Sequence, residues 1–398
     1  MKRALMNNQS RIVIVDMAVE KRSPAGSCVL AEVMGLAEYF DVTVFSNRCD
    51  AVNVAGVEWV YIPLPSRPIL FRYWLFHFLA PIAYMFWRLS GKKATYIQGT
   101  QGQFVGADVV YAHFCHRAYL KGPWRESTVT GIRRLARWLN HAFNTFFERL
   151  AINRAKKIVV PSLGLGRELS KEYPGVADRI ITIANPVDII RFSQPEDFDR
   201  QAFRAQLGVS SGEIAISFMA LGDFARKGLG LLITAIARLP DEQRSQLRLI
   251  VIGGQTSEIE SFKQKAEHQG VGDRLVFVGM QDDVHNYLWA TDAYVFPSAY
   301  EIFSLAILQA AAAGLPVLVS EQLYGAEEFI RDGENGWVVP RTDEGVTRGL
   351  ERIIGDRNRL PQMAAMAAQS VQCYSMKIFP EHWMQLYSSD LTNSDSLE

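Results

Sequence analysis

Short apolar runs alternate with helix-like segments along this chain, and that alternation constrains the fold more than any other feature of the sequence. Apolar, β-branched runs are typical of buried strands, and the segments between them show helical periodicity. In the first half the predicted strands are Ile12–Val15, Val42–Phe45, Val57–Ile62, Val109–Ala112 and Lys157–Val160, and the first predicted helix is Cys28–Tyr39. Strands separated by helices favour a parallel sheet with right-handed crossovers.

The second half of the chain repeats this pattern. Its predicted strands are Ile214–Ala220, Leu247–Ile252, Leu275–Val278, Ala293–Phe296 and Val317–Val319, with helical segments between them. At 398 residues the chain exceeds the size of one ordinary hydrophobic core. The sequence therefore predicts an α/β protein with two Rossmann-like domains facing each other across a cleft, where ligands usually bind.

The domain boundary is predicted at Asn185–Asp188, because the polar stretch Ser193–Asp199 follows it. We expect one domain over residues 1–188 and a second over residues 189–372. The remaining residues, 373–398, are predicted to form a helical segment that could cross back to the first domain.

A loop with a single acidic residue follows the strand Ala293–Phe296. The strand ends in Pro297-Ser298, the loop carries Glu301, and an alanine-rich helix begins at once. Unpaired backbone N–H groups and the helix dipole make such loops binding sites for phosphorylated ligands in α/β proteins. A carboxylate beside an anion site needs a separate reason, and binding the hydroxyl groups of a sugar would supply one.

The loop Gly222–Gly228 places two adjacent cations, Arg226 and Lys227, between the first strand and the first helix of the second half. It lacks the GK[ST] of a Walker loop, but two cations suit a diphosphate and could neutralise charge on a leaving group. The alternative is an exposed basic turn. Glycines at two further strand ends, Gly253-Gly254 and Gly279-Met280, allow a ligand to approach the backbone closely. Together these loops predict a nucleotide site at the carboxyl edge of one sheet.

Small residues also separate the first strand from the first helix, at Ala25-Gly26-Ser27. This segment is not a GxGxxG fingerprint, yet it lets a phosphate or sugar approach the helix N-terminus. His113 and His116 follow the strand Val109–Ala112, and such a pair suits an acid/base or hydrogen-bonding role. A lone His is more often structural. No carboxylate or third His lies nearby in sequence, so we predict no metal site.

The chain has no net charge, but its charges are unevenly distributed. Residues 1–190 contain 24 Lys and Arg against 14 Asp and Glu, and most of the excess lies between residues 67 and 157. A basic region favours an anionic partner such as nucleic acid, a membrane surface or a phosphorylated lipid, whereas a solvated surface is the simpler alternative. Because the region is also rich in aromatic residues, we favour an anionic membrane surface and expect no nucleic acid.

The most apolar part of this region is Ile69–Trp87, which is about as long as a membrane span but contains Arg72, His77 and Pro81. A span would break the strand–helix pattern on both sides. We therefore favour a helix lying in the membrane interface, or a mostly buried helix with an exposed aromatic edge, over a spanning helix. The segment Gly131–Lys157 predicts an amphipathic helix whose apolar stripe packs on the sheet and whose arginines meet the membrane.

The four cysteines, Cys28, Cys49, Cys115 and Cys373, show neither CxxC nor zinc-site spacing. They indicate no disulfide framework and no metal site, which fits a reducing compartment. Polar residues at Asn7–Arg11 interrupt any apolar core near the start, so we expect no export signal. The predicted location is cytoplasmic, with peripheral attachment to the inner face of the membrane.

Several of these motifs together resemble the GT-B glycosyltransferases, and within them glycosyltransferase family 4, over almost the whole chain. The most specific part is Pro297–Val319, which is similar to the family's Glu-x7-Glu region. Arg226-Lys227-Gly228 resembles the family's donor-diphosphate motif. Similar matches are Asn185–Asp188 to the domain junction, Pro24–Ser27 to the N-terminal glycine loop, and Glu148 with Lys157–Ser162 to the helix and strand before the junction.

Two positions depart from the family pattern. Gln309 stands where a second Glu usually accepts hydrogen bonds from the ribose hydroxyls, and its neutral carbonyl oxygen should bind ribose more weakly. Ser304 stands where Gly is commoner, which changes how the backbone approaches the donor. Glu301 and the cation pair are retained, so activity is still expected.

The resemblance implies a hexosyltransferase-type enzyme that moves a sugar from a nucleotide-diphosphate donor with retention of configuration, without a metal or other cofactor. Arg226 and Lys227 would stabilise the leaving group, Glu301 would bind the donor sugar, and His113 would lie on the acceptor side near the reacting centre. The acceptor would be a lipid-linked or glycan molecule at the membrane, in polysaccharide or glycolipid synthesis. The residues expected at the donor are Gly26, Gly222, Arg226, Lys227, Gly254, Met280, Glu301, Phe303, Ser304, Leu305 and Gln309, and those at the acceptor are Ser27, His113 and His116.

Two other functions stay open on the sequence. A nucleotide-sugar epimerase of the same architecture would need acid/base carboxylates in the cleft, and the first half is poor in acidic residues. A non-catalytic nucleotide-sugar-binding protein is supported only by Gln309.

Overall fold

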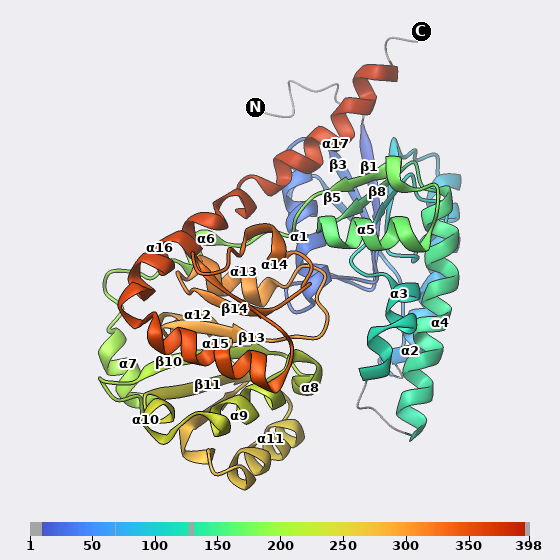
Figure 1. Cartoon of the computed structure of the whole chain (residues 1–398). Coiled ribbons are helices and arrows are strands. Elements are labelled where there is room, and N and C mark those ends of the chain that lie inside the picture. The colour runs from blue at the N-terminus through green and yellow to red at the C-terminus, as the bar shows by residue number, and fades with distance from the viewer. Residues whose placement is uncertain (1–9, 68, 127–130, 395–398) are drawn as a thin grey trace. The chain divides into compact units, whose positions relative to one another are not determined.

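The computed structural model describes residues 10–67, 69–126 and 131–394. These fold into two compact units (Figure 1). The first unit extends to Pro186 and also includes the chain from Met376 onward, and the second is Val187–Ser375. The expectation of no export signal concerns residues that lie mostly outside the described part of the chain.

The first unit contains a sheet of seven parallel strands among its described residues, in the order β5-β3-β1-β6-β7-β8-β9. These strands are β1 (Arg11–Val15), β3 (Asp41–Ser46), β5 (Val57–Tyr61), β6 (Tyr96–Thr100), β7 (Val109–Tyr111), β8 (Lys157–Val160) and β9 (Ile180–Thr182). A short parallel pair, β2 (Ala18–Val19) with β4 (Arg48–Cys49), lies outside this sheet. Ile12–Val15 in the central strand are fully buried, as expected for a parallel sheet covered on both faces.

Helices of the first unit follow the predicted alternation with strands. They are α1 (Pro24–Leu36), α2 (Ile69–Leu89), α3 (His116–Lys121), α4 (Gly131–Arg154), α5 (Leu163–Glu172) and α17 (Phe379–Ser394). Helix α1 begins where the sequence favours it, because the Oγ of Ser23 accepts from the N–H of Gly26 and Pro24 occupies the first turn.

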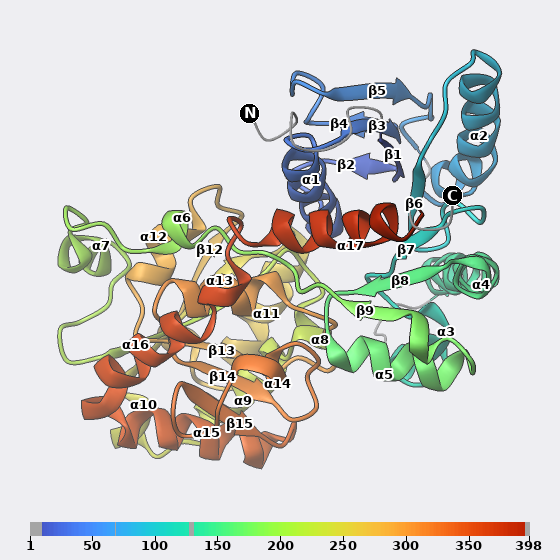
Figure 2. The same ribbon diagram turned by 90° about the horizontal axis from the view of Figure 1, so that it is seen from above.

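Helix α17 returns from the end of the second unit and packs against α1 (Figure 2). The contact is close, since a Cβ on Gly35 would lie 2.3 Å from the Cβ of Pro380. Tyr387 of α17 also donates a buried hydrogen bond to the amide oxygen of Gln98 on β6. The last helix is therefore part of the first unit's core.

The second unit contains six parallel strands in the order β12-β11-β10-β13-β14-β15. They are β10 (Ile214–Ala220), β11 (Leu247–Gly253), β12 (Leu275–Gly279), β13 (Ala293–Phe296), β14 (Val317–Ser320) and β15 (Gly336–Val339). Its helices are α6 (Ile189–Phe192), α7 (Arg200–Gln206), α8 (Phe224–Lys227), α9 (Leu229–Arg238), α10 (Asp241–Arg244), α11 (Thr256–His268), α12 (Val284–Trp289), α13 (Leu305–Ala312), α14 (Ala326–Phe329), α15 (Asp343–Gly355) and α16 (Leu360–Ser370). From β10 the chain adds strands outward on one side of the sheet as far as β12, and it then returns to the other side of β10 to form β13. Strands β10 and β13 are therefore neighbours at the topological switch point, where α/β sheets bind ligands.

The apolar stripe of α4 does not pack on the sheet along most of its length, so that prediction is wrong for most of the stripe. Ile132 is 86% exposed, and Leu135, Leu139 and Phe146 are also exposed. Phe143 does have a partner, but on a helix, since its ring stacks on Trp74 of α2 with centroids 5.1 Å apart.

Helix α2 has a buried side and an exposed aromatic edge, but it is not mostly buried as one of the two favoured interpretations expected. Phe76 and Ala80 are fully buried, whereas Phe78 and Phe86 are exposed. Among the described residues no helix, α2 included, is long and apolar enough to cross a bilayer.

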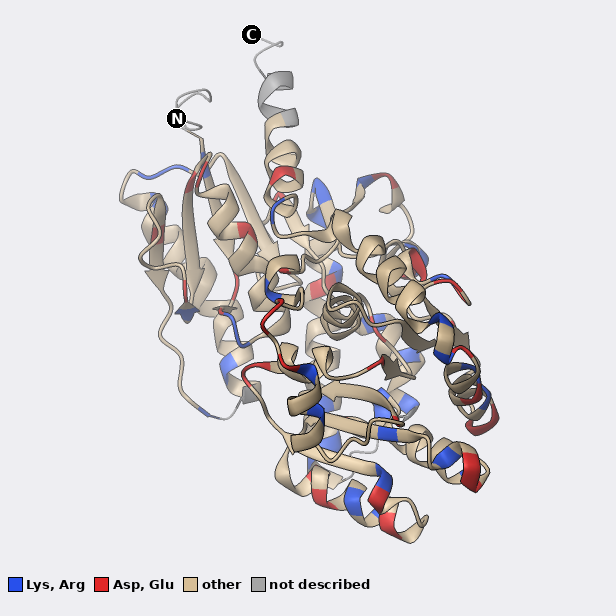
Figure 3. Ribbon diagram, turned by 90° about the vertical axis from the view of Figure 1, so that its left-hand side faces the viewer, with Lys and Arg blue, Asp and Glu red and all other residues tan. Residues whose placement is uncertain are grey.

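Acidic and basic residues are interspersed along the ribbon in the view of Figure 3. The net charge difference between the two halves of the sequence therefore does not correspond to two single-sign faces in that view. Part of the basic excess of the first half lies on the exposed surface of α4, at Arg133, Arg134 and Arg137.

Candidate functional site

The predicted site residues of the second half lie in loops at the carboxyl edge of one sheet. Strand β10 leads into the loop containing Gly222–Gly228, and its neighbour β13 leads into the loop Pro297–Ser304. Because the two strands are parallel and adjacent, their loops meet at the same edge. The N–H of Ala299 donates to the carbonyl oxygen of Arg226 at 2.9 Å, which joins the two loops directly.

Gly228 lets these loops approach each other. Its φ is +91°, a left-handed conformation that favours glycine, and a Cβ there would lie 2.2 Å from the carbonyl oxygen of Pro297. Asp223, at the start of the same loop, is also left-handed, with φ +62° and ψ +41°. The loop that carries the cation pair is therefore held in one unusual conformation by its contact with the β13 loop.

The cation pair and the carboxylate predicted from the sequence come together at one oxygen, Oε1 of Glu301. Lys227 Nζ donates to this oxygen, and Arg226 Nη1 lies 3.5 Å from it. The hydroxyl of Ser298 also donates to it, at 2.8 Å. The side chain of Lys227 is 17% exposed and that of Glu301 is 11% exposed, so the pair is mostly buried.

Two electrostatic effects on the pKa of Lys227 oppose each other. Burial lowers the pKa of Lys227, and the adjacent Glu301 carboxylate acts in the opposite direction by stabilising the ammonium form. Lys227 also lies over the ring of Phe296, with Nζ 5.3 Å from the ring centroid. Arg226 is held by Asp223, whose Oδ2 accepts from Nε at 2.7 Å, and by the carbonyl oxygen of Tyr300 at 2.6 Å.

Two residues of this cluster, Asp223 and Ser298, were not among the predicted site residues. Both lie in segments that the sequence singled out, but neither has a local pattern that assigns it a partner. Ser298 meets Glu301 within its own loop, whereas Asp223 acts through Arg226.

The other residues predicted at the donor differ in their exposure and in their packing contacts. Met280 is exposed after β12, and Gly222, Ser304, Leu305 and Gln309 are half-buried. Ser304 precedes α13 without capping it by its side chain. Gly254 and Phe303 have clear packing roles, because a Cβ on Gly254 would meet the Phe224 ring at 2.3 Å and the ring of Phe303 lies 5.4 Å from that of Tyr374. Their contact with a donor stays a prediction.

In the first unit Gly26 also has a packing role. A Cβ there would lie 2.2 Å from the carbonyl oxygen of Ala18, so α1 can lie against β2 only with glycine at this position. The hydroxyl of Ser27 donates to the carbonyl oxygen of Pro24, at 2.8 Å. The small residues of this segment therefore shape the first turn of α1.

His113 lies just beyond β7 and is positioned through its backbone. With its amide oriented to satisfy both partners, Gln101 accepts from the N–H of His113 at 2.7 Å and donates to the carbonyl oxygen of Phe114 at 3.1 Å. Burial lowers the pKa of His113 to about 3, so its imidazole is neutral near pH 7. Its Nε2 is buried and has no hydrogen-bond partner among the described residues.

His116 has a more structural environment. Its Nδ1 lies 2.9 Å from Nδ1 of His141, and burial lowers the pKa of His116 to about 3. Its backbone N–H donates to Glu148 at 2.8 Å, at the first turn of α3. Burial raises the pKa of Glu148 to about 7, and the hydroxyl of Tyr173 donates to this carboxyl group at 2.6 Å. Glu148 therefore acts as a buried cap of α3, a role that the sequence did not reveal.

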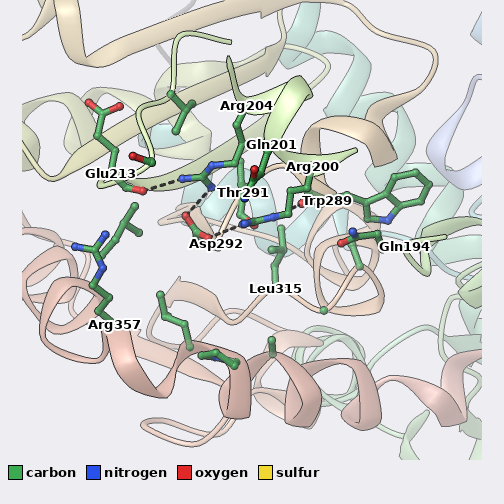
Figure 4. Close-up of a pocket in the computed structure, with 18 of the residues that line it drawn as sticks. Gln194, Arg200, Gln201, Arg204, Glu213, Trp289, Thr291, Asp292, Leu315 and Arg357 are labelled. Atoms are coloured by element: carbon green, nitrogen blue, oxygen red, sulfur yellow. Dashed lines mark hydrogen bonds and ion pairs between the residues drawn. The ribbon is translucent and has the colours of Figure 1, made fainter. Parts of the chain in front are cut away.

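A recess of the second unit lies at the opposite, amino edge of its sheet (Figure 4). It has a volume of about 670 Å³ and is lined by Arg200, Arg204 and Arg357, among others. Its arginines are engaged by the protein itself, since Asp292 accepts from Arg200 at 2.5 Å and from Arg204 at 2.9 Å. We therefore assign this network to holding α7 on the sheet, and place the candidate site at the carboxyl edge. Within the described ranges, no group of three or more His, Cys, Asp or Glu is placed to hold a metal ion.

Solved structures share the fold of the whole chain. The glycosyltransferase WaaG, described as involved in lipopolysaccharide biosynthesis, has a TM-score of 0.73 and 20% identity, and the match covers 94% of this chain and 99% of WaaG. Anabaena HepE in complex with UDP has a TM-score of 0.68 and 19% identity, covering 95% of this chain and all of that one. At such identities the likeness shows the fold alone.

Family comparison decides the assignment. Residues 26–191 match the family described as Glycosyltransferase Family 4, and residues 199–370 match the one described as Glycosyl transferases group 1. The chain belongs to the GT-B glycosyltransferases of the family 4 type. A curated relative, the lipopolysaccharide core biosynthesis glycosyltransferase LpsE of Rhizobium meliloti (strain 1021), is 32% identical over 219 residues. That match covers 54% of this chain and 62% of LpsE, so the chain spans less than two thirds of the relative's length.

Proposed function

We propose that this protein transfers a sugar from a nucleotide-diphosphate donor to a membrane-associated, lipid-linked glycan acceptor, with retention of configuration. The observation that carries the proposal is the convergence of Arg226, Lys227 and Glu301 at the carboxyl edge of the second sheet. A diphosphate needs cations and a sugar needs hydrogen-bond acceptors, and this cluster supplies both. The complexes of HepE with UDP and with UDP-glucose support a nucleotide sugar as the donor.

The chemical role of the cation pair follows from charge. When the bond between the sugar and the diphosphate breaks, negative charge builds on the departing phosphate oxygen. Arg226 and Lys227 are mostly buried, and a charge in a poorly solvated site stabilises such an oxygen more than it would in water. We propose that these two side chains neutralise the leaving group without a metal ion or other cofactor. Retention is proposed by analogy with family 4.

On the acceptor side we propose His113 as the residue beside the reacting centre. Its neutral imidazole can accept a hydrogen bond from a hydroxyl group or donate one to it, depending on the tautomer. The buried Nε2 without a partner among the described residues is the atom we assign to this contact. The descriptions of LpsE and WaaG, both tied to lipopolysaccharide, support a lipid-linked glycan as acceptor.

Membrane attachment is proposed through α2 and α4. The exposed apolar residues of these helices include Phe78 and Phe86 on α2 and Ile132 and Leu135 on α4. Exposed arginines flank the apolar residues of α4, and apolar insertion combined with basic side chains is typical of helices that bind anionic bilayers from one side. We propose peripheral attachment to the cytoplasmic face of the membrane.

A donor-hydrolysis and transfer assay tests the enzymatic proposal. Nucleotide sugars that differ in base and sugar are incubated with the protein and membrane lipid extract, and release of the nucleoside diphosphate is measured. Lys227→Met and Glu301→Ala should each reduce turnover by at least about a hundredfold, because each removes a group that contacts the donor. Binding without any turnover would favour a non-catalytic binding protein, and a change of sugar configuration without release of the diphosphate would favour an epimerase.

Flotation with liposomes tests the membrane proposal. The protein should float with anionic vesicles at low salt and less at high salt, because salt screens the arginine contacts. Replacing Arg133, Arg134 and Arg137 with Gln should reduce flotation on anionic vesicles. The matched control replaces three exposed cations of the second unit, Lys263, Lys265 and Arg348, with Gln. Absence of flotation at both salt concentrations would contradict the proposal.

A further inference from the structure

Both cations of the donor cluster are already paired with carboxylates of the same two loops. Asp223 accepts from Arg226 Nε at 2.7 Å, and Glu301 contacts both Lys227 and Arg226. The four side chains together carry two positive and two negative charges. Two further charged side chains contact these loops, and they have opposite signs. Glu258 accepts from the N–H of Phe224, and Arg341 donates to the carbonyl oxygen of Pro297.

This balance has a direct consequence for an anionic ligand. A nucleoside diphosphate that binds Arg226 and Lys227 must do so beside two carboxylates that already contact nitrogen atoms of these two side chains. Each carboxylate repels the incoming phosphates and competes for the same N–H donors. Because Glu301 and Lys227 are mostly buried, water screens the repulsion from Glu301 only weakly, whereas Asp223, with 43% of its side chain exposed, is screened more.

The two carboxylates differ in whether they can also bind the sugar of the donor. Glu301 presents Oε1 to Lys227, Arg226 and Ser298, and its second oxygen can accept a hydrogen bond from a sugar hydroxyl. The sugar of a nucleotide sugar therefore contributes favourable binding free energy at Glu301, which offsets part of the repulsion between the phosphates and the carboxylates. A free nucleoside diphosphate has no sugar to do so.

We propose that Asp223 and Glu301 act as internal competitors of the diphosphate and keep the affinity for the free nucleoside diphosphate low, so that the leaving group dissociates after transfer. This inference rests on the proposed function, since it assumes that Arg226 and Lys227 receive a diphosphate. It assigns Asp223 a role in product release, and it gives Glu301 a second role besides holding the donor sugar.

Two conservative variants separate charge from geometry. Asp223→Asn removes one negative charge, and Asn tolerates the left-handed backbone at this position and can still accept from Arg226. Glu301→Gln removes the other charge and keeps an oxygen that can accept from Ser298. The matched control is Glu351→Gln, an exposed position on α15 where the net charge changes by the same amount.

The test is isothermal titration of each protein with UDP, ADP, GDP and CDP, with folding checked by circular dichroism. The best-binding nucleoside diphosphate should bind Glu301→Gln about five- to tenfold more tightly than the wild type, as removing one mostly buried like charge implies. It should bind Asp223→Asn about two- to threefold more tightly, because the side chain of Asp223 is 43% exposed and water screens its charge, and it should bind Glu351→Gln unchanged. Turnover of Glu301→Gln should fall although its diphosphate affinity rises, which a merely structural role would not produce. If Glu301→Gln fails to fold, Asp223→Asn alone decides.

The competitor role and the donor site are contradicted by different results. If the wild type binds a nucleoside diphosphate and Asp223→Asn binds it equally or more weakly, the competitor role is overturned and the donor site stays in place. Absence of binding of all four nucleoside diphosphates to the wild type and to both variants would overturn the donor site itself, and with it the competitor role.

Discussion

Replacing Gly228 with alanine should displace the loop that carries Arg226 and Lys227. Two features of Gly228 lead to this expectation. Its φ of +91° is strained for any residue with a Cβ, and the Cβ would lie 2.2 Å from the carbonyl oxygen of Pro297. Pro297 begins the loop that carries Glu301, so the substitution separates the two loops whose side chains form the candidate site.

The expected loss of stability has two parts. The left-handed backbone costs alanine about 1 kcal/mol relative to glycine. The contact with Pro297 involves a backbone oxygen, so no side-chain rotation relieves it and one of the loops must move, which costs about 2 kcal/mol more. We therefore expect the second unit to lose about 3 kcal/mol of stability, a large part of what a domain of this size has.

Hydrogen exchange of the β10 and β13 amides measures this loss in the second unit by itself, independently of the unfolding of the first unit. The matched control is Gly208→Ala, because Gly208 has φ +69° and nothing within 4 Å of its Cβ position. It carries only the backbone cost and should lose about 1 kcal/mol. Nucleoside diphosphate affinity should fall in Gly228→Ala and not in Gly208→Ala. Equal losses of stability in the two variants would refute the reasoning, because the contact with Pro297 would then contribute nothing.

Three further predictions concern the first unit. Burial raises the pKa of Glu148 from its ordinary value of 4.5 to about 7, so the folded state holds a proton that the unfolded state has released, and the contribution of Glu148 to stability falls by about 3 kcal/mol as pH rises between these values. The buried histidines act in the opposite direction, so the measurement is the difference in stability between the wild type and Glu148→Gln in urea titrations. That difference should change by about 3 kcal/mol between pH 4.5 and pH 7 in favour of the variant, and a constant difference would count against it. Tyr387→Phe removes a buried hydrogen bond to Gln98 and should cost about 1–2 kcal/mol, seen as faster exchange of the α17 amides and not of β10. His113, whose pKa burial lowers to about 3, should show no change of its imidazole NMR signals between pH 5 and pH 8, and a titration within that range would contradict its buried, neutral state.

The sequence predicted the strand and helix order well because that order is written in contiguous residues. Ile214–Ala220, for example, is an unbroken apolar run, and the structure makes it the fully buried strand β10. Arg226, Lys227 and Glu301 could be selected for the same reason, since each follows a strand and precedes a helix. Their meeting at one oxygen could not be predicted, because it depends on β10 and β13 being neighbours although about 75 residues separate them.

Burial was harder to infer than periodicity. The stripe of α4 has the spacing of a packed helix, yet Ile132 and Leu135 are exposed, because no other described element covers that end of the helix. Glu148 lies on the same helix and is buried, with a pKa raised to about 7. Helical spacing states which residues share a face, and only the neighbouring elements decide whether that face meets protein or solvent.

By itself, therefore, the sequence determined two α/β units, the strand-end loops and the charged residues of the candidate site. Local periodicity, turn residues and the dipole at a helix N-terminus are short-range properties, and a chain carries them wherever it folds. Tertiary structure alone decided that Gly228 must lie against Pro297 and that Asp223 and Glu301 balance the cation pair. These contacts join two loops through the register of adjacent parallel strands, and register is a property of the assembled sheet that no single segment encodes.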